Sequence, residues 1–254
     1  MVDVQNIEIN NIPSLVVTSS NKQNEPLPTV IYSHGFTSSK EFNLPIAYLL
    51  AAEGYRVVLP DSLHHGERAG QIQSVERQGA FWHIVLQNIE ELKTIRNYFA
   101  DQNLIENDLV GVAGTSMGGI TTAAALTQYD WIHVAAILMG SPKMTEYANL
   151  TIDQFLQAGE LPVTEEELKT LLGQLKSLDL SLQPDKLENR PLLFWHGESD
   201  TVVPAEHAKS FYENVRGSYE NGDHIRLLLE ANRNHKVSRR AVLETVEWFK
   251  QYLS

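Results

Sequence analysis

Hydrophobic positions recur along the chain with two different periods. Short runs rich in β-branched and aromatic residues, typical of strands, alternate with longer stretches in which apolar residues recur every three or four positions, typical of helices. The predicted strands include Ile7, Ile9, Ile12, Leu15–Val17, Thr29–Ser33, Tyr55–Leu59, Leu109–Ala113, Ile132–Met139, Leu192–Trp195 and Ile225–Leu229. The predicted helices cover Glu41–Glu53, Gly79–Ala100, Met117–Tyr129, Ala205–Val215 and Arg239–Tyr252. This alternation predicts an α/β fold, a mostly parallel sheet with helices on both faces.

Residues 141–190 interrupt the alternation. This stretch contains no clear strand, only helical patterns such as Glu165 to Leu178. Helices inserted at the carboxyl edge of a parallel sheet would lie over the face where such folds bind ligands. We therefore expect a single domain over residues 1–254, with 141–190 as a small helical cap insertion. The alternative is a surface excursion that plays no part at the site.

Composition limits the possible partners and locations. The 254 residues include 43% hydrophobic residues, enough for one large α/β domain or two small ones. A net charge of −12 argues against nucleic acid and against anionic membranes as partners. Cysteine is absent, which excludes disulfides and thiolate metal sites. No apolar run approaches the ~20 residues of a membrane span, and the start of the chain lacks the pattern of a signal peptide. A cytoplasmic location is expected.

One pentapeptide carries candidate chemistry. Residues 114–118 read Gly-Thr-Ser-Met-Gly and match the pattern G-x-S-x-G. Chance supplies such a match roughly one time in ten in a chain of this composition. Here a predicted strand precedes the motif and a predicted helix follows it, the context that sets a nucleophilic serine on a sharp turn. We predict Ser116 as the nucleophile. The alternative is an incidental serine at a glycine-rich helix entry.

A serine hydroxyl needs an adjacent general base, and in folds with this motif the order along the chain is Ser, then Asp or Glu, then His. His235 lies in the loop between the last predicted strand and the last predicted helix, so we predict it as the base. His224 precedes that strand and His207 falls inside a predicted helix, so both are interpreted as surface histidines. His196, at a strand end, is interpreted as structural.

The acid should follow the strand that ends near Trp195. We predict Asp200, whose carboxylate would hold the histidine tautomer and stabilise the imidazolium without taking the proton. Glu198 is the second choice because it lies closer to the strand end. Alternatively, Asp200 could simply cap the helix that follows Pro204.

An oxyanion hole requires two backbone N–H groups. In this fold one comes from the residue after the nucleophile, here Met117, and one from the loop after the third strand, where Phe36 is the best candidate. Such donors contribute ~3 kcal/mol each. Gly35 would allow a tight turn that aims the Phe36 amide, and His34 is interpreted as a structural residue that bonds the loop backbone. The two residues after Phe36 are alternatives in positioning the loop.

A second cluster could suggest a metal. Asp61, His64, His65 and Glu67 lie close together after a predicted strand, and two histidines with two carboxylates could bind zinc. Adjacent histidines often diverge, however, and the spacing H-E-x-x-H is absent. We interpret the segment as a loop at the rim of the site, within which Glu67 and Arg68 could pair in a structural role. Neither a metal nor a cofactor is expected.

These motifs together resemble the α/β-hydrolase superfamily across nearly the whole chain. Within it, four segments resemble small bacterial carboxylesterases of the YitV and YjfP type, related to dienelactone hydrolases and to the catalytic domain of prolyl oligopeptidases. The segments are His34–Glu41, Asp61–Arg68, Gly114–Gly119 and Trp195–Pro204. The resemblance implies esterase activity on a small-molecule ester, with Ser116, Asp200 and His235 at the triad positions. The cysteine nucleophile of dienelactone hydrolases is missing, and the chain has no room for the propeller of the oligopeptidases.

Two other functions stay open. The same triad could cleave a small peptide or amide, although no gating domain is present. A binding module without catalysis could also retain this fold. The residues that bind substrate are not identified: Phe36, Trp82, Trp131 and apolar residues between Met144 and Leu178 could line an acyl pocket or belong to the core.

Overall fold

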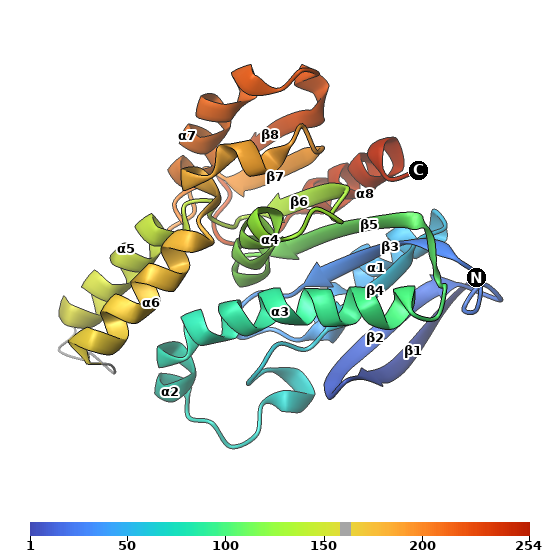
Figure 1. Cartoon of the computed structure of the whole chain (residues 1–254), viewed down its shortest axis with the longest axis horizontal. Coiled ribbons are helices and arrows are strands. Elements are labelled where there is room, and N and C mark those ends of the chain that lie inside the picture. Colours follow the sequence, from blue (N-terminus) through green and yellow to red (C-terminus); the bar gives the residue numbers. More distant parts are fainter. Residues whose placement is uncertain (158–163) are drawn as a thin grey trace.

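The computed structural model describes residues 1–157 and 164–254. Eight strands form one sheet in the order β1-β2-β4-β3-β5-β6-β7-β8 (Figure 1). The strands are β1 Val2–Ile9, β2 Ile12–Ser19, β3 Leu27–Ser33, β4 Arg56–Pro60, β5 Ile105–Thr115, β6 Val134–Leu138, β7 Leu192–Gly197 and β8 Ile225–Glu230. Only β1 with β2 and β2 with β4 pair antiparallel, and the other neighbours pair parallel. The predicted α/β fold with a mostly parallel sheet is confirmed.

Helices cover both faces of the sheet (Figure 1). The helices are α1 Leu44–Ala52, α2 Ser74–Gly79, α3 Phe81–Ala100, α4 Met117–Gln128, α5 Met144–Gln157, α6 Glu165–Ser177, α7 Ala205–Val215 and α8 Arg239–Tyr252. Neighbouring residues of one strand belong to different cores: Ile31 faces the core beneath α3, α4 and α7, whereas Val30 faces the core beneath α1 and α8. Because helices cover both faces, β4, β6 and β7 are buried throughout. Strands buried on both faces have mostly apolar sequences rather than an alternation of apolar and polar residues.

The topology brings the candidate residues to one edge. The carboxyl ends of parallel strands meet at the same edge, and the crevice beyond them is where open α/β sheets bind ligands. The chain steps from β3 to β4 on one side and places β5 on the other side of β3. The loops after β3 and β5, which begin with His34 and Ser116, therefore diverge at this switch point.

The described part of 141–190 contains α5 and α6 followed by two 3₁₀ helices at Leu180–Leu182 and Pro184–Leu187, and no strand; residues 158–163 of the predicted insertion lie outside the described residues. Figure 1 shows α5 and α6 side by side, extending away from the sheet. Their ends near the sheet are anchored in an apolar cluster in which Met144, Tyr147 and Leu175 pack with Trp82 and Met117. The start of α5 thus belongs to the same apolar cluster as Met117, the residue that follows Ser116. A role for this segment as a cap remains a prediction.

Two element boundaries differ from those predicted. The expected helix Glu41–Glu53 is divided into a 3₁₀ turn, Lys40–Asn43, and α1, because Pro45 occupies the first turn of α1. The helix expected from Gly79 is preceded by α2, which has no buried residue and so leaves no hydrophobic pattern in the sequence. None of the described helices is long and apolar enough to cross a membrane.

Candidate active site

Ser116 stands on a strained turn between β5 and α4. Its backbone has φ 55° and ψ −113°, in the region that side chains other than glycine rarely adopt. Glycines on either side allow the close approach that this turn needs. A Cβ added to Gly114 would lie 2.3 Å from the carbonyl carbon of Gly118, and one added to Gly118 would lie 2.1 Å from the oxygen of Ser33. The turn therefore holds the hydroxyl clear of the backbone.

A chain of hydrogen bonds joins the three residues predicted as a triad. The Ser116 hydroxyl lies 2.8 Å from His235 Nε2, and His235 Nδ1 lies 2.7 Å from Asp200 Oδ2. Because a carboxylate only accepts, Nδ1 carries the proton and Nε2 is free to accept from the serine. Glu198, the second choice for the acid, is exposed, and its backbone amide donates to Glu230. The structure brings Asp200 rather than Glu198 to the histidine.

The Asp200 carboxylate is buried and fully hydrogen-bonded. Oδ1 accepts from the amides of Val202 and Val203 at 2.8 and 3.0 Å, and Oδ2 accepts from His196 Nε2 at 3.1 Å as well as from His235. Burial alone would raise the pKa of Asp200, but the bonds from His196, His235 and Val202 hold this pKa well below its usual range. Asp200 is thus an anion that is fixed in position.

Of His196 and His207, neither of which was predicted as the general base, one has the role expected of it and the other does not. His196 is structural as expected, and its contact with Asp200 is one that the sequence did not indicate. The interpretation of His207 as a surface residue is wrong: it is buried at the foot of α7, 2.8 Å from the Ser141 hydroxyl and 3.4 Å from Glu146. The reason is that His207 lies on the helix face turned toward the sheet, next to Ala208 and Phe211.

Two backbone amides near Ser116 are free. Within residues 1–157 and 164–254, neither the Phe36 nor the Met117 amide donates a hydrogen bond to another protein group. Met117 is the first residue of α4, where N–H groups lack a partner within the helix.

Gly35 was expected to allow a tight turn that aims the Phe36 amide, but the structure does not support this reason for a glycine. The residue of this loop with a left-handed backbone is Thr37, with φ 64°. A Cβ on Gly35 would meet Thr115 and Ser116 at ordinary contact distances of 3.4 and 3.5 Å.

Two neutral histidines fasten the loop after β3 to the loop after β4. His34 donates from Nδ1 to the Gly35 carbonyl and accepts the Ser62 amide at Nε2, at 2.7 and 3.0 Å. His65 donates to the Leu63 carbonyl and accepts the Thr37 amide, at 2.9 and 3.1 Å. Burial lowers the pKa of both imidazoles, that of His65 to about 4. His34 has the structural role expected of it, and both ring nitrogens of His65 are engaged by backbone rather than free for a metal.

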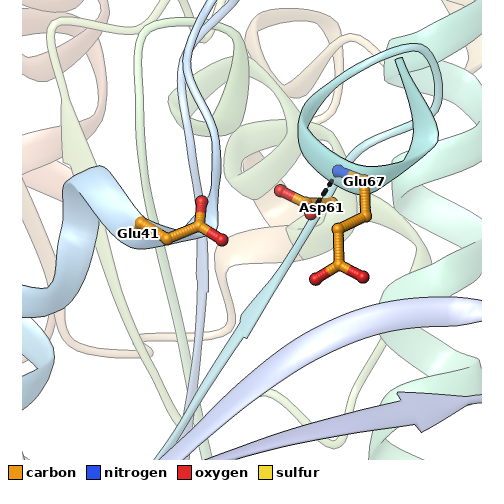
Figure 2. Close-up of side chains that lie close together, drawn as sticks. All are labelled: Glu41, Asp61 and Glu67. Atoms are coloured by element: carbon orange, nitrogen blue, oxygen red, sulfur yellow. Dashed lines mark hydrogen bonds between the residues drawn. The ribbon is translucent and has the colours of Figure 1, made fainter. Parts of the chain in front are cut away.

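The carboxylates of this region surround an ammonium group. Glu41, Asp61 and Glu67 gather with carboxylate oxygens within 4.8 Å of one another (Figure 2). Lys40 Nζ, which is completely buried, lies 2.5 Å from Asp61, 2.7 Å from Glu67 and 3.1 Å from Glu41. Although burial opposes its charge, these bonds raise the pKa of Lys40 above its ordinary value. A cation of the chain itself therefore contacts all three carboxylates and offsets one of their negative charges.

The expected pair of Glu67 and Arg68 does not form. Glu67 binds Lys40, and Arg68 makes two bonds of 2.9 Å to the buried carboxylate of Glu91 on α3. Successive side chains of a 3₁₀ turn point in different directions, so each of the two finds a partner in a different part of the chain. The two tryptophans considered for a pocket are packed: Trp82 is buried and Trp131 stacks on Tyr129.

A cavity of about 520 Å³ adjoins the hydrogen-bonded chain. It opens between the start of α1 and the start of α8, and Ser116 and His235 are among its lining residues. Residues from the loop after β3 also line it, including Phe36. Volumes of this order accommodate small organic ligands.

The sheet, the strained serine turn and the Ser–His–Asp chain define an α/β hydrolase. A model of the prolyl oligopeptidase family matches residues 41–254, and the chain belongs to this family and is a hydrolase. It is 47% identical to "Putative esterase YitV" of Bacillus subtilis and 30% identical to "Esterase YjfP" of Escherichia coli, in each case over 100% of both chains. Among solved structures, TT1662 from Thermus thermophilus matches with a TM-score of 0.81 and 18% identity, covering 100% of this chain and 99% of that one. The predicted relationship is confirmed.

Proposed function

We propose that the protein is a serine carboxylesterase that forms an acyl-enzyme on Ser116. The observation that carries the proposal is the position of the His235 imidazole, which lies between the Ser116 hydroxyl and the buried Asp200 carboxylate at 2.8 and 2.7 Å. The names of the two full-length relatives support an ester as the substrate.

Acylation uses each of these groups in turn. Ser116 Oγ attacks the ester carbonyl carbon while its proton moves to His235 Nε2. The carbonyl oxygen becomes an oxyanion, which accepts hydrogen bonds from the free amides of Phe36 and Met117. Asp200 stabilises the imidazolium through the Nδ1 proton. The C–O bond to the alcohol then breaks, and the alcohol leaves with the proton from His235.

Deacylation repeats the sequence with water. His235 Nε2 takes a proton from a water molecule, whose oxygen attacks the acyl carbon of the Ser116 ester. The same two amides hold the second oxyanion. When the bond to Oγ breaks, the proton returns from His235 to Ser116, and the carboxylic acid is released. No group other than the chain and water is required.

A peptide or amide substrate is the second candidate, favoured by the description of the family. The same steps can expel an amine, because His235 can protonate a leaving nitrogen. Two full-length relatives named as esterases favour the ester. Parallel assays with aminoacyl anilides separate the candidates: faster turnover of anilides than of matched esters would favour the peptidase.

The test compares wild type with Ser116→Ala on a panel of p-nitrophenyl esters. We expect kcat to fall by up to about 10⁶. Ser210→Ala is the matched control, because Ser210 lies on α7 and bonds only the carbonyl of Glu206 among the described residues. A fluorophosphonate probe should label wild type and Ser210→Ala but not Ser116→Ala. Equal turnover in all three proteins, or labelling of Ser116→Ala, would reject the proposal.

A further inference from the structure

The cavity next to Ser116 differs in charge from the rest of the protein. The whole chain has 32 Asp and Glu against 20 Lys and Arg. The cavity lining, all from described residues, includes two cations, Lys236 and Arg239, and neither Asp nor Glu. Both cations are exposed and follow His235 closely in the chain. The cavity therefore carries a positive charge inside an acidic protein.

Neither cation is neutralised by the protein. In the part of the chain that the structure describes, no carboxylate oxygen lies within 4.0 Å of Lys236 Nζ or of the Arg239 guanidinium. Their neighbours do pair: Arg233 lies 2.8 Å from Glu230, and Arg240 lies 3.7 Å from Glu244. The unpaired charges of this segment are thus the ones that line the cavity.

The position of Arg239 is unfavourable for the helix that contains it. Arg239 is the first residue of α8, directly after its N-cap Ser238. The aligned peptide dipoles place a partial positive charge at this end, where Asp and Glu are favoured and a cation is not. Helix stability therefore does not explain Arg239. An anion in the cavity would be attracted by Lys236, by Arg239 and by the end of the helix together.

Apolar side chains form part of the cavity wall, beside polar ones such as Asn43 and Ser238. Phe42, Pro45 and Ile46 line it from the side of α1, and Val237 and Val242 line it from the side of α8. Phe42 is 77% exposed, so its ring is accessible to a ligand in the cavity. Such walls bind a short hydrocarbon segment. The whole cavity thus suits a small molecule with an apolar middle and an anionic group.

We propose that the preferred substrates are esters that carry a carboxylate or phosphate group, held by Lys236 and Arg239. The inference rests on the proposed function, because the ester carbonyl must lie at Ser116 while the anion lies at the cations. The anionic group belongs to either the acyl or the alcohol part and is unchanged by the reaction. Lys236 and Arg239 determine specificity and take no part in the transfer of protons.

The experiment measures kcat/KM for two pairs of esters that differ in charge. The acyl pair is mono-p-nitrophenyl adipate with p-nitrophenyl hexanoate, and the alcohol pair is 4-acetoxybenzoate with its neutral methyl ester. The ratio of the anionic to the neutral ester is determined in wild type, in Arg239→Gln, in the double variant Lys236→Gln/Arg239→Gln and in Arg240→Gln. The last is the matched control, since Arg240 adjoins Arg239, loses the same charge and does not line the cavity.

We expect the ratio in one pair to fall about fivefold in Arg239→Gln and about tenfold in the double variant, while Arg240→Gln keeps the wild-type ratio. The pair that responds identifies the part of the ester that carries the anion. Raising the ionic strength to about 1 M, where the Debye length is ~3 Å, should lower the ratio in wild type and not in the double variant. A ratio of rates for one enzyme sample does not depend on how much of it is folded.

Equal ratios in wild type, Arg239→Gln and Arg240→Gln for both pairs would overturn the inference. That result is distinguishable from failure of the proposed function. If hydrolysis of the neutral esters is lost in Ser116→Ala but the ratios do not shift, only the anionic preference is wrong. If Ser116→Ala hydrolyses the neutral esters like wild type, the proposed function is wrong as well.

Discussion

Two buried carboxylates flank the strand that leads to Ser116, one on each side. Asp61 follows β4 and Asp200 follows β7, and each of these strands is two positions from β5 in the sheet. Both side chains have no exposed surface, and each accepts two backbone amides. They differ in their basic partners, which are Lys40 for Asp61 and His235 for Asp200. The same residue type in the same setting thus has two different partners.

The difference lies in when the partner is charged. Lys40 is always an ammonium, so its attraction to Asp61 is already complete in the resting protein and holds two loops together. In the proposed mechanism His235 is neutral while its Nε2 accepts a hydrogen bond from the Ser116 hydroxyl. Asp200 then attracts it most strongly once His235 has taken the proton and become an imidazolium. A preorganised anion of this kind stabilises a charge that develops only during the reaction. Under the proposed function, the pair of Asp61 with Lys40 supports the fold and the pair of Asp200 with His235 supports the chemistry.

The largest expected effect comes from Asp200→Asn. The amide can donate to His235 Nδ1 and so favours the wrong tautomer, and we expect kcat to fall about 10⁴-fold. The fold should be retained, because Asn keeps an oxygen for the amides of Val202 and Val203. Ester assays measure kcat, and thermal unfolding monitors the fold. Glu198→Gln, in the same loop but exposed, is the control. Activity in Asp200→Asn equal to that of this control would contradict the assigned role.

Asp61→Asn should act on stability instead. Removing this charge leaves buried Lys40 with only Glu67 and Glu41, both about half exposed, as carboxylate partners. Breaking a buried pair in this way typically costs about 3–5 kcal/mol of the free energy of unfolding. Urea denaturation measures the change. The control is Asp108→Asn, whose exposed pair with Arg96 should contribute less than about 1 kcal/mol.

A double variant tests whether the cost arises from the unpaired cation. Lys40→Met combined with Asp61→Asn removes both charges, so we expect the two together to destabilise by less than the sum of the single variants. If the single effects simply add, the ammonium and the carboxylate act independently. In that case the contrast between Asp61 and Asp200 would lose its physical basis.

The sequence was sufficient to predict the features that rest on local patterns. Periodicity predicts the sheet and most helices, and the pentapeptide with its strand and helix predicts the strained turn at Ser116. Asp200 and His235 were predicted from their order along the chain and their places just after strands. Each of these inferences needs only a few consecutive residues and the rule that parallel strands end at one edge.

The missed features depend on contacts between distant residues. Lys40 is 21 residues from Asp61, and His207 is 66 residues from Ser141, so no local pattern joins the partners. Lys40 is completely buried although lysine is almost never buried without a partner. The second bond to Asp200, from His196, was missed for a related reason. It forms only when the loop after β7 folds back onto its own strand.

The smallest expected effect concerns the pH dependence of stability. It distinguishes His65, on the side of Asp61, from His235, on the side of Asp200. Burial lowers the pKa of His65 to about 4 in the folded protein, whereas an unfolded histidine has a pKa of about 6.5. Between these values the unfolded chain binds a proton that the folded chain does not. The contribution of His65 to stability is therefore complete above pH 6.5 and is lost as the pH falls toward 4, by on the order of 3 kcal/mol.

Replacing His65 with Gln keeps an acceptor for the Thr37 amide but removes the titration. Urea denaturation between pH 4 and pH 7 should show a shallower loss of stability in His65→Gln than in wild type, with the remaining slope due partly to His34 and His207, whose pKa values burial also lowers. His64→Gln, which still contains His65, should follow wild type. Identical slopes in all three proteins would mean that His65 protonates freely in the fold. The contrast between the two histidines would then fail. His65 would not be a histidine that the fold keeps neutral, in contrast to His235, which is proposed to take a proton.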